Sequence, residues 1–339
     1  MCKSRVDAWW LLFGSLTCAL LLGTVTTTLF FGALSFWALR EYITLTPTRP
    51  ADHKTLVGVF FVLTPLQFIL VGINPSWFLE KFHLESYFVY SALIPSLAFL
   101  ILPATVAVSG DPKFFLERIA KLQVGLLICV YSLSFAPAMM TLSLPNSRPT
   151  NSLDIKAVNL EDAALRQFGE TVVQIATPET EGNDVVENLA ETNQKATAHR
   201  KTKAPNVTLL FAFVLLTQIS DVAQFFWSLA FPKRKIAAKV NSRKTYYGVA
   251  LGALTTALFA IALWYFLPFA HWLQAAFAGV IIAMMGFAGN MTISAIKRDQ
   301  NVDDYGALID GHSGVLDRID SLCFAAPVFF HYVRVCCGM

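Results

Sequence analysis

The chain has 339 residues, of which 55% are hydrophobic and only 14% are charged, and its mean hydropathy is +0.54. A soluble domain carries about 25% charged residues, so this composition excludes an ordinary soluble protein and indicates a polytopic membrane protein. The formal net charge of +3 is too small to favour nucleic acid as a partner. The six cysteines lack metal-ligand spacing and mostly lie in or beside apolar runs, so we interpret them as small apolar side chains.

Apolar runs predict the membrane spans, because a helix needs about 20 apolar residues to cross a bilayer. The first run, 8–39, is too long for one simple span. It predicts either one long kinked helix or two short helices that meet near "GTVTTT", and we expect it to be retained as an anchor. Seven further spans are predicted at 55–73, 86–108, 122–144, 207–230, 247–269, 272–294 and 321–337. The fold class is therefore an all-α transmembrane bundle of eight spans, or nine if the first run is a hairpin.

Basic residues in the short connections predict the orientation of the spans. The loop 231–246 holds six lysines and arginines and no acid, so we expect it to be cytoplasmic. The loop 295–320 follows two spans later and should face the same side. Counting backward places the loops 40–54 and 109–121 there as well. The bases near the N-terminus also favour the cytoplasm, which requires two spans in the first run.

The polar composition changes between the fourth and fifth predicted spans. Residues 145–206 are rich in Thr, Asn and Glu, which is typical of a long and partly disordered loop, here on the non-cytoplasmic side. This loop divides the chain into N-terminal transmembrane helices at 1–144 and a C-terminal transmembrane region at 207–339.

One polar cluster begins inside an apolar span. Asp221 falls near the middle of 207–230 and follows Ser220. A carboxylate at this depth is costly unless it is paired or lines a polar cavity. It is either a structural hydrogen-bonding group or part of a cation or phosphate site. The basic run that follows is either a topology signal or a binding surface for anionic lipid heads or a polyphosphate.

A second cluster is the stretch "SAIKRDQNVDDYGALIDGHSGVLDRIDS" at 294–321. Asp317 and Asp320 are three residues apart, so in a helix both carboxylates lie on one face and offer hard oxygen ligands to a divalent cation. Three bases of the stretch offer phosphate contacts: Lys297, Arg298 and Arg318. The plain alternative is a charged connector whose ions pair with one another. Together, both clusters favour anionic phosphate chemistry at the membrane surface.

This stretch resembles the signature of phosphatidate cytidylyltransferases, S-x-x-K-R-x4-K-D-x-G-x2-[LIF]-P-x-H-G-G-x2-D-R-x-D. The matching positions are Ser294, Lys297, Arg298, Asp304, Gly306, Ile309, His312, Gly314, Asp317, Arg318 and Asp320. An upstream region is similar to the family's "SD…K..P..S.KT.EG", through Ser220, Asp221, Lys235, Lys239, Ser242, Lys244, Thr245 and Gly248. The segment "ALREYITLTP" resembles an early "REY" motif of the family.

The resemblance implies a divergent bacterial-type member with a polar cavity open to the cytoplasm. It implies that CTP and phosphatidic acid give CDP-diacylglycerol and pyrophosphate with Mg²⁺, a second cation being left open. The implied catalytic residues are Asp221, Asp317, Asp320 and His312. The implied substrate-binding residues are Ser220, Lys239, Lys244, Ser294, Lys297, Arg298, Asp304 and Arg318. The implied metal ligands are Asp317 and Asp320, with Asn290 where the family usually has an aspartate.

The chain departs from the family pattern at five positions: Tyr247, Asn290, Asp303, Asp310 and Ser313. These departures keep a second hypothesis open, that of a non-catalytic or weakly active membrane relative that binds lipid or nucleotide. A transporter ranks third, because Asp221 alone lies deep in a predicted span. The resemblance further implies contact with membrane lipids and a bacterial inner-membrane location with the active site facing the cytoplasm. A homodimer is left open.

Overall fold

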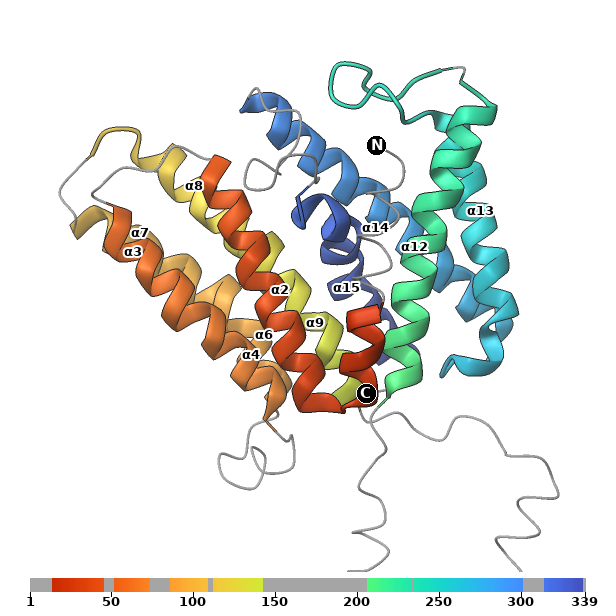
Figure 1. The fold of residues 1–339 in the computed structure, drawn as a ribbon, viewed down its shortest axis with the longest axis horizontal. Coiled ribbons are helices and arrows are strands. Elements are labelled where there is room, and N and C mark those ends of the chain that lie inside the picture. Colours follow the sequence, from red (N-terminus) through yellow and green to blue (C-terminus); the bar gives the residue numbers. More distant parts are fainter. Residues whose placement is uncertain are drawn as a thin grey trace, which may run out of the picture. The chain divides into compact units, whose positions relative to one another are not determined.

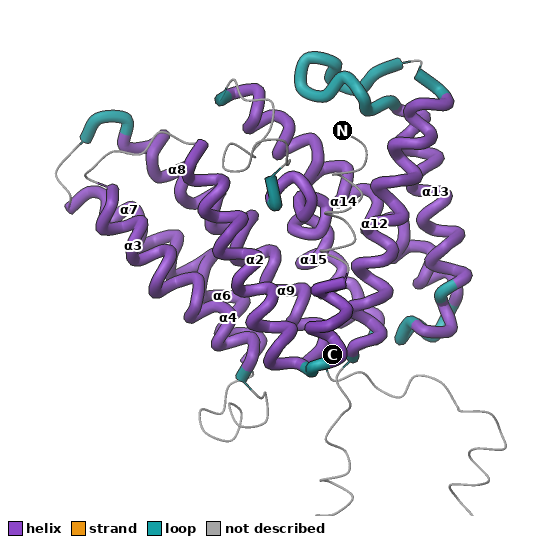
Figure 2. The backbone as a smooth tube through the Cα atoms, viewed as in Figure 1, coloured by secondary structure: helices purple, strands orange, loops and turns teal. Residues whose placement is uncertain are grey.

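The computed structural model describes residues 14–45, 52–73, 86–108, 112–142, 206–232, 234–300 and 314–337. These residues are almost entirely helical and include no β-strand, as Figures 1 and 2 show. The chain divides into two compact units. One comprises Met1–Leu142 together with Pro205–Met339, and the other comprises Ser143–Ala204. The second unit lies outside the described residues, so the polar loop predicted at 145–206 stays a prediction.

Six helical segments of the described chain are long and apolar enough to cross a membrane. They are His53–Gly72, Tyr87–Val108, Phe115–Thr141, Val207–Ala230, Trp272–Asp299 and Leu316–Cys336. Each overlaps one of the predicted spans, so those six are confirmed. The predicted total of eight or nine is not confirmed. At the predicted span 247–269 the apolar helix ends at Ala262, which makes it shorter than a usual membrane crossing.

The first apolar run is broken at Gly23. A helix at 14–21 ends there, and α2 (Thr24–Leu45) begins directly afterwards. Gly23 has φ +106°, a backbone conformation that residues with a Cβ rarely adopt. The Thr27 hydroxyl donates to the Ala19 carbonyl at 3.0 Å, which ties the two helices across the turn. The break agrees with the alternative of two helices meeting near "GTVTTT", although α2 continues beyond the predicted end of the run.

Three N-terminal spans are built from consecutive helical pieces, each with a π-helical stretch. The first joins α3 (His53–Gly58), the π-helical Val59–Leu63 and α4 (Thr64–Gly72). The second joins α6 (Ser86–Ala92), the π-helical Leu93–Ala98 and α7 (Phe99–Val108). The third joins α8 (Phe115–Gly125), the π-helical Leu126–Ser132, α9 (Leu133–Ala138) and a 3₁₀ turn at Met139–Thr141. Pro65 and Pro95 lie beside or within such stretches, where the missing proline N–H leaves the helical hydrogen-bond ladder free to change its spacing.

The C-terminal helices carry the polar clusters. They are α12 (Val207–Ala230), α13 (Tyr246–Ala262), α14 (Trp272–Asp299) and α15 (Leu316–Cys336). Each packs against the next one along the chain, and α15 also packs against α9 and α2. The predicted loop 295–320 is too long, because α14 continues to its end at Asp299 and α15 begins at Leu316. Lys297 and Arg298 therefore lie in the last turn of α14, where positive charge complements the helix dipole.

Several basic connections lie at one end of the helices. Figure 1 shows four of these places on its upper side: the end of α2, the start of α8, the loop 231–245 and the end of α14. This arrangement agrees with the prediction that these connections face one side of a membrane. Which compartment they face stays a prediction.

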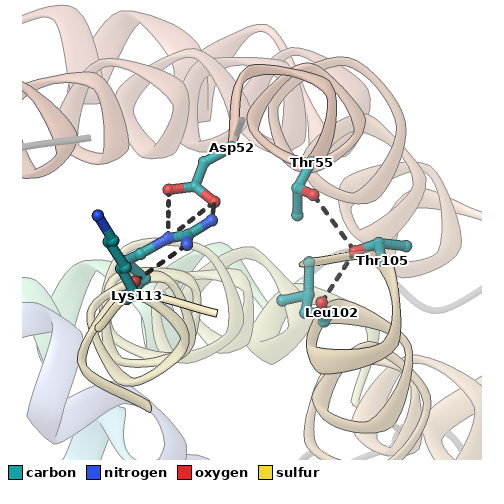
Figure 3. Close-up of polar contacts among 6 residues, drawn as sticks. Asp52, Thr55, Leu102, Thr105 and Lys113 are labelled. Atoms are coloured by element: carbon teal, nitrogen blue, oxygen red, sulfur yellow. Dashed lines mark hydrogen bonds and ion pairs between the residues drawn. The ribbon is translucent and has the colours of Figure 1, made fainter. Parts of the chain in front are cut away.

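An ion pair joins two of these connections (Figure 3). Asp52, which precedes α3, accepts from Arg118 Nε of α8 at 2.8 and 3.1 Å, and Arg118 Nη2 contacts the same carboxylate. Arg118 Nη1 also donates to the Lys113 carbonyl at 3.2 Å. Both charged side chains are buried, and such a pair needs full hydrogen bonding to offset its desolvation. Nearby, Thr55 and Thr105 join α3 to α7 through their hydroxyls at 3.3 Å.

Candidate functional site

Three helices bring polar side chains together around Asp221. The Ser321 hydroxyl of α15 donates to Asp221 Oδ1 of α12 at 2.8 Å. Asn290 Nδ2 of α14 lies 2.6 Å from Ser321 Oγ, 3.4 Å from Asp221 Oδ1 and 3.2 Å from the Gly286 carbonyl. The amide therefore turns its nitrogen toward these acceptors. Asp221 thus has partners from two other helices, which is what a carboxylate inside a membrane span requires.

Asp320 is the second acid of this group. It is 7% exposed, and its Oδ1 accepts from the Ser321 backbone N–H at 2.7 Å. The Ser321 hydroxyl lies 3.4 Å from the same oxygen, so one serine contacts the carboxylates of both Asp221 and Asp320. Two carboxylates so close together repel each other and favour a cation between or beside them.

Lys244 supplies positive charge to this group from the loop that follows α12. Its Nζ donates to Gln224 Oε1 at 2.9 Å, and Gln224 Nε2 in turn lies 3.1 Å from the hydroxyl of Ser220. Burial lowers the pKa of Lys244, and the nearby carboxylates of Asp221 and Asp320 partly oppose that shift. The amine therefore loses its charge at lower pH than a free lysine does.

The loop 231–245 places Lys244 through local backbone contacts. The Ile236 N–H donates to the Lys244 carbonyl at 3.0 Å, and the Tyr246 N–H donates to the Arg234 carbonyl at 3.2 Å. Thr245 is the N-cap of α13 and accepts from the Gly248 N–H at 3.0 Å. A threonine cap fixes where a helix starts, so Lys244 is held directly before the N-cap of α13. This contact gives a physical reason for the "KT.EG"-like pattern.

Two further contacts link the loop and α15 to the end of α14. Asn241 Nδ2 of the loop donates to Ser294 Oγ at 3.1 Å. Lys297 Nζ pairs with Asp317 Oδ1 at 2.6 Å. Both side chains of that ion pair are largely buried, at 17% and 12% exposure. Lys297 thus places one positive charge beside the first acid of "DRID".

The structure brings together many of the predicted site residues and separates others. Asp221, Asp320 and Asn290 meet at Ser321, and Lys244 and Ser220 meet at Gln224 one turn further along α12. Lys244 interacts electrostatically with both acids. Ser294, Lys297 and Asp317 lie at the neighbouring ends of α14 and α15. Arg318 is 9% exposed, whereas Lys239 and Arg298 are exposed. Asp304 and His312 lie outside the described residues. The roles assigned to all of these residues stay predictions.

Four polar residues of the region were not predicted as site residues: Glu41, Gln224, Asn241 and Ser321. Ser321 directly follows "DRID", so its place beside Asp320 is visible once that segment is helical. Asn241 lies within the basic loop, and the charge pattern of that loop does not indicate its contact with Ser294. Glu41 belongs to the "REY" segment, and its contact to α15 joins residues 274 positions apart, which no local pattern shows.

The residues around Asp221 fit a small hard cation. Among the described residues, no cluster of three or more His, Cys, Asp or Glu side chains could hold a metal. Mg²⁺, however, is usually bound by one or two carboxylates together with substrate phosphates and waters. Asp221 and Asp320 supply two carboxylates, and the Ser321 hydroxyl is a neutral oxygen that contacts both. Asn290 turns its amide nitrogen toward this group, so its oxygen would become a ligand only if the amide rotated by half a turn. The chemistry of this donor set suits Mg²⁺ and a phosphate chain.

The fold and site define an integral membrane protein whose described residues are almost entirely helical, with acids and a lysine grouped at its C-terminal helices. Residues 3–336 match the model of the Cytidylyltransferase family. The chain belongs to this family, and the family classes it as a nucleotidyltransferase.

Individual relatives are of two kinds. The chain is 30% identical over 336 residues to an uncharacterized protein, YnbB, of Escherichia coli (strain K12), covering 98% of this chain and 87% of that one. It is 37% identical over 135 residues to a phosphatidate cytidylyltransferase of Haemophilus influenzae, covering 37% of this chain and 44% of the enzyme. It is 35% identical over 123 residues to a phosphatidate cytidylyltransferase of Pseudomonas aeruginosa, covering 36% of this chain and 45% of the enzyme. The chain therefore matches less than half the length of these two enzymes.

Proposed function

We propose that the protein transfers the cytidylyl group of CTP to phosphatidic acid, giving CDP-diacylglycerol and pyrophosphate. The observation that carries this proposal is the pair of carboxylates of Asp221 and Asp320, which share the Ser321 hydroxyl between membrane helices, with the Lys244 ammonium close enough to interact with both acids electrostatically. Family membership and the names of the partial relatives support the choice of substrates. An inner-membrane location with the site facing the cytoplasm is part of the proposal.

The proposed reaction joins two anions. A phosphate oxygen of the lipid forms a bond to the α-phosphorus of CTP, and the bond from that phosphorus to the bridging oxygen of pyrophosphate breaks. Bound Mg²⁺ would neutralise the phosphate chain and the leaving group. Asp221 and Asp320, with Asn290 and Ser321, would hold it. Lys244, and Lys297 beyond it, would attract the phosphates, because positive charge fixed in a low-dielectric site stabilises developing negative charge.

The direct test uses purified full-length protein in phosphatidic acid vesicles with CTP and Mg²⁺. We expect CDP-diacylglycerol and pyrophosphate to form in equal amounts. If CTP or the lipid binds and no pyrophosphate appears, the protein is a non-catalytic binding relative. The amide of Asn290 favours that second function, since a neutral ligand there weakens the attraction for a cation.

Asn290→Asp should raise the affinity of the site for a divalent cation. The new carboxylate would lose the contact that the amide donates to Asp221 and would repel that acid instead. With Mg²⁺ the extra charge becomes a ligand. We expect half-maximal activity at a Mg²⁺ concentration about tenfold lower than in the wild type, since one hydrogen-bonded charge is worth about 1.5–3 kcal/mol. An unchanged Mg²⁺ titration would remove Asn290 from the metal site.

Lys244→Arg should change the pH dependence of CTP binding. Burial lowers the pKa of Lys244. As the pH rises, this amine therefore loses its charge before a free lysine does, whose pKa is about 10.4. CTP affinity of the wild type should therefore fall on the alkaline side, since the neutral amine no longer attracts phosphate. A guanidinium keeps its charge in this range, so the variant should lack this fall whatever its absolute affinity. Parallel pH profiles for both proteins would contradict a phosphate-binding role for Lys244.

A further inference from the structure

Glu41 of α2 makes a contact that the proposed reaction does not use directly. Its Oε1 accepts from the Val315 N–H at 3.0 Å, and its Oε2 accepts from the Leu316 N–H at 2.9 Å. Trp37 Nε1 donates to Oε1 at 3.2 Å and fixes the carboxylate from its own helix. Glu41 is 6% exposed, so water does not replace these contacts easily.

The Glu41 carboxylate supplies the N-terminal cap that α15 lacks in its own sequence. The first N–H groups of a helix have no partner inside the helix, and a side chain near the N-cap usually accepts from them. The N-cap of α15 is Val315, which makes no side-chain cap. The Glu41 carboxylate fills that role from a distant helix, and its negative charge complements the positive end of the helix dipole. It therefore fixes both the position and the direction of the first turn of α15.

That first turn carries the acids of the candidate site. Asp317 lies one residue after Leu316, and Asp320 follows one turn later beside Asp221. We propose that Glu41 is a positioning residue that caps α15 from α2 and so holds Asp317 and Asp320 in place for the reaction. This inference rests on the proposed function for its catalytic part, whereas the capping contact can be tested by itself.

The test compares Glu41→Gln with Glu41→Asp in purified full-length protein. The amide of Gln presents a donor to one of the two N–H groups and has no charge, while Asp keeps the charge on a shorter side chain. Glu117→Gln is the matched control, because it makes the same change at an exposed carboxylate of α8 that pairs with Lys121 on the same helix. Two measurements are made, amide hydrogen exchange by peptide and steady-state kinetics with CTP.

For Glu41→Gln we expect faster exchange in the peptide spanning 315–320 and unchanged exchange in α4, which serves as the internal reference. Turnover should fall about tenfold or more, because small displacements of catalytic groups cause rate losses of this size. The KM for CTP should stay within about twofold, because the cap itself does not bind the nucleotide. Glu41→Asp should recover part of the turnover, and Glu117→Gln should match the wild type in both measurements.

Unchanged exchange at 315–320 in Glu41→Gln would overturn the cap. Faster exchange there with wild-type turnover would overturn the positioning role. A rise in exchange of the same size in α4 would show general destabilisation and would also overturn it. If the wild type itself transfers no cytidylyl group, the proposed function fails, and the exchange measurement still decides whether Glu41 caps α15.

Discussion

Asp320→Asn should reduce cytidylyl transfer by about 100-fold or more, the loss typical when a group that holds transition-state charge is removed. Asp320 is a buried acid that shares the Ser321 hydroxyl with Asp221, and these two carboxylates form the acidic part of the candidate site. The amide has nearly the same shape, so the helix packing is retained while the charge is lost. The measurement is the initial rate of pyrophosphate release at saturating CTP.

Asp299→Asn is the matched control for this variant. It makes the same chemical change at the end of α14, where the exposed carboxylate accepts from the side chain of the neighbouring Gln300. We expect wild-type rates for it. Near-normal turnover in Asp320→Asn, with equal expression and melting temperature, would exclude Asp320 from the reacting centre.

Gly289→Ala should also cause a large loss, through packing rather than charge. A Cβ at this position would lie 2.5 Å from the Asp320 carbonyl oxygen and 3.0 Å from the Phe324 ring. Alanine favours a helix over glycine by about 1 kcal/mol, but overpacking costs about 1–3 kcal/mol, so the collision outweighs the propensity. The backbone of α15 must shift at Asp320. We expect turnover to fall about tenfold or more, with a smaller fall in melting temperature.

Gly286→Ala provides the comparison on the same helix. Its added Cβ would lie 3.4 Å from the Ser321 Cβ, an ordinary van der Waals distance. The same methyl would lie 3.6 Å from Ser321 Oγ and 3.9 Å from Asp221 Oδ1 without collision. The variant should therefore lose much less turnover than Gly289→Ala and gain slightly in thermal stability from helix propensity. If Gly286→Ala and Gly289→Ala behave alike, the close approach of α14 to α15 does not control the position of Asp320.

The sequence predicted those features that a short stretch of residues specifies by itself, such as an apolar run or a charged residue within one. Six spans were found from apolar length alone, and Asp221 stood out because a carboxylate inside an apolar run has few explanations. The break of the first run was placed near the right residues, because Gly23 precedes a threonine cluster. The number of spans was harder to predict, since an apolar run does not show where a helix turns back or ends early, as α13 does at Ala262.

The partners of the site residues could not be predicted in the same way. "DRID" suggested that Asp317 and Asp320 act as a pair, yet Asp317 lies against Lys297 and Asp320 shares Ser321 with Asp221. Helical spacing gives the face on which a residue lies, but the neighbouring helices decide what that face meets. The cap that Glu41 provides to α15 depends on how α2 packs, and no spacing in either segment indicates it.

The most direct test of the proposed activity measures labelled cytidylyl transfer from CTP to phosphatidic acid by the purified wild-type protein, with Asp320→Asn beside it. We expect labelled CDP-diacylglycerol in the wild type and at least about 100-fold less in the variant. Absence of labelled lipid in a wild-type sample that still binds phosphatidic acid would contradict it.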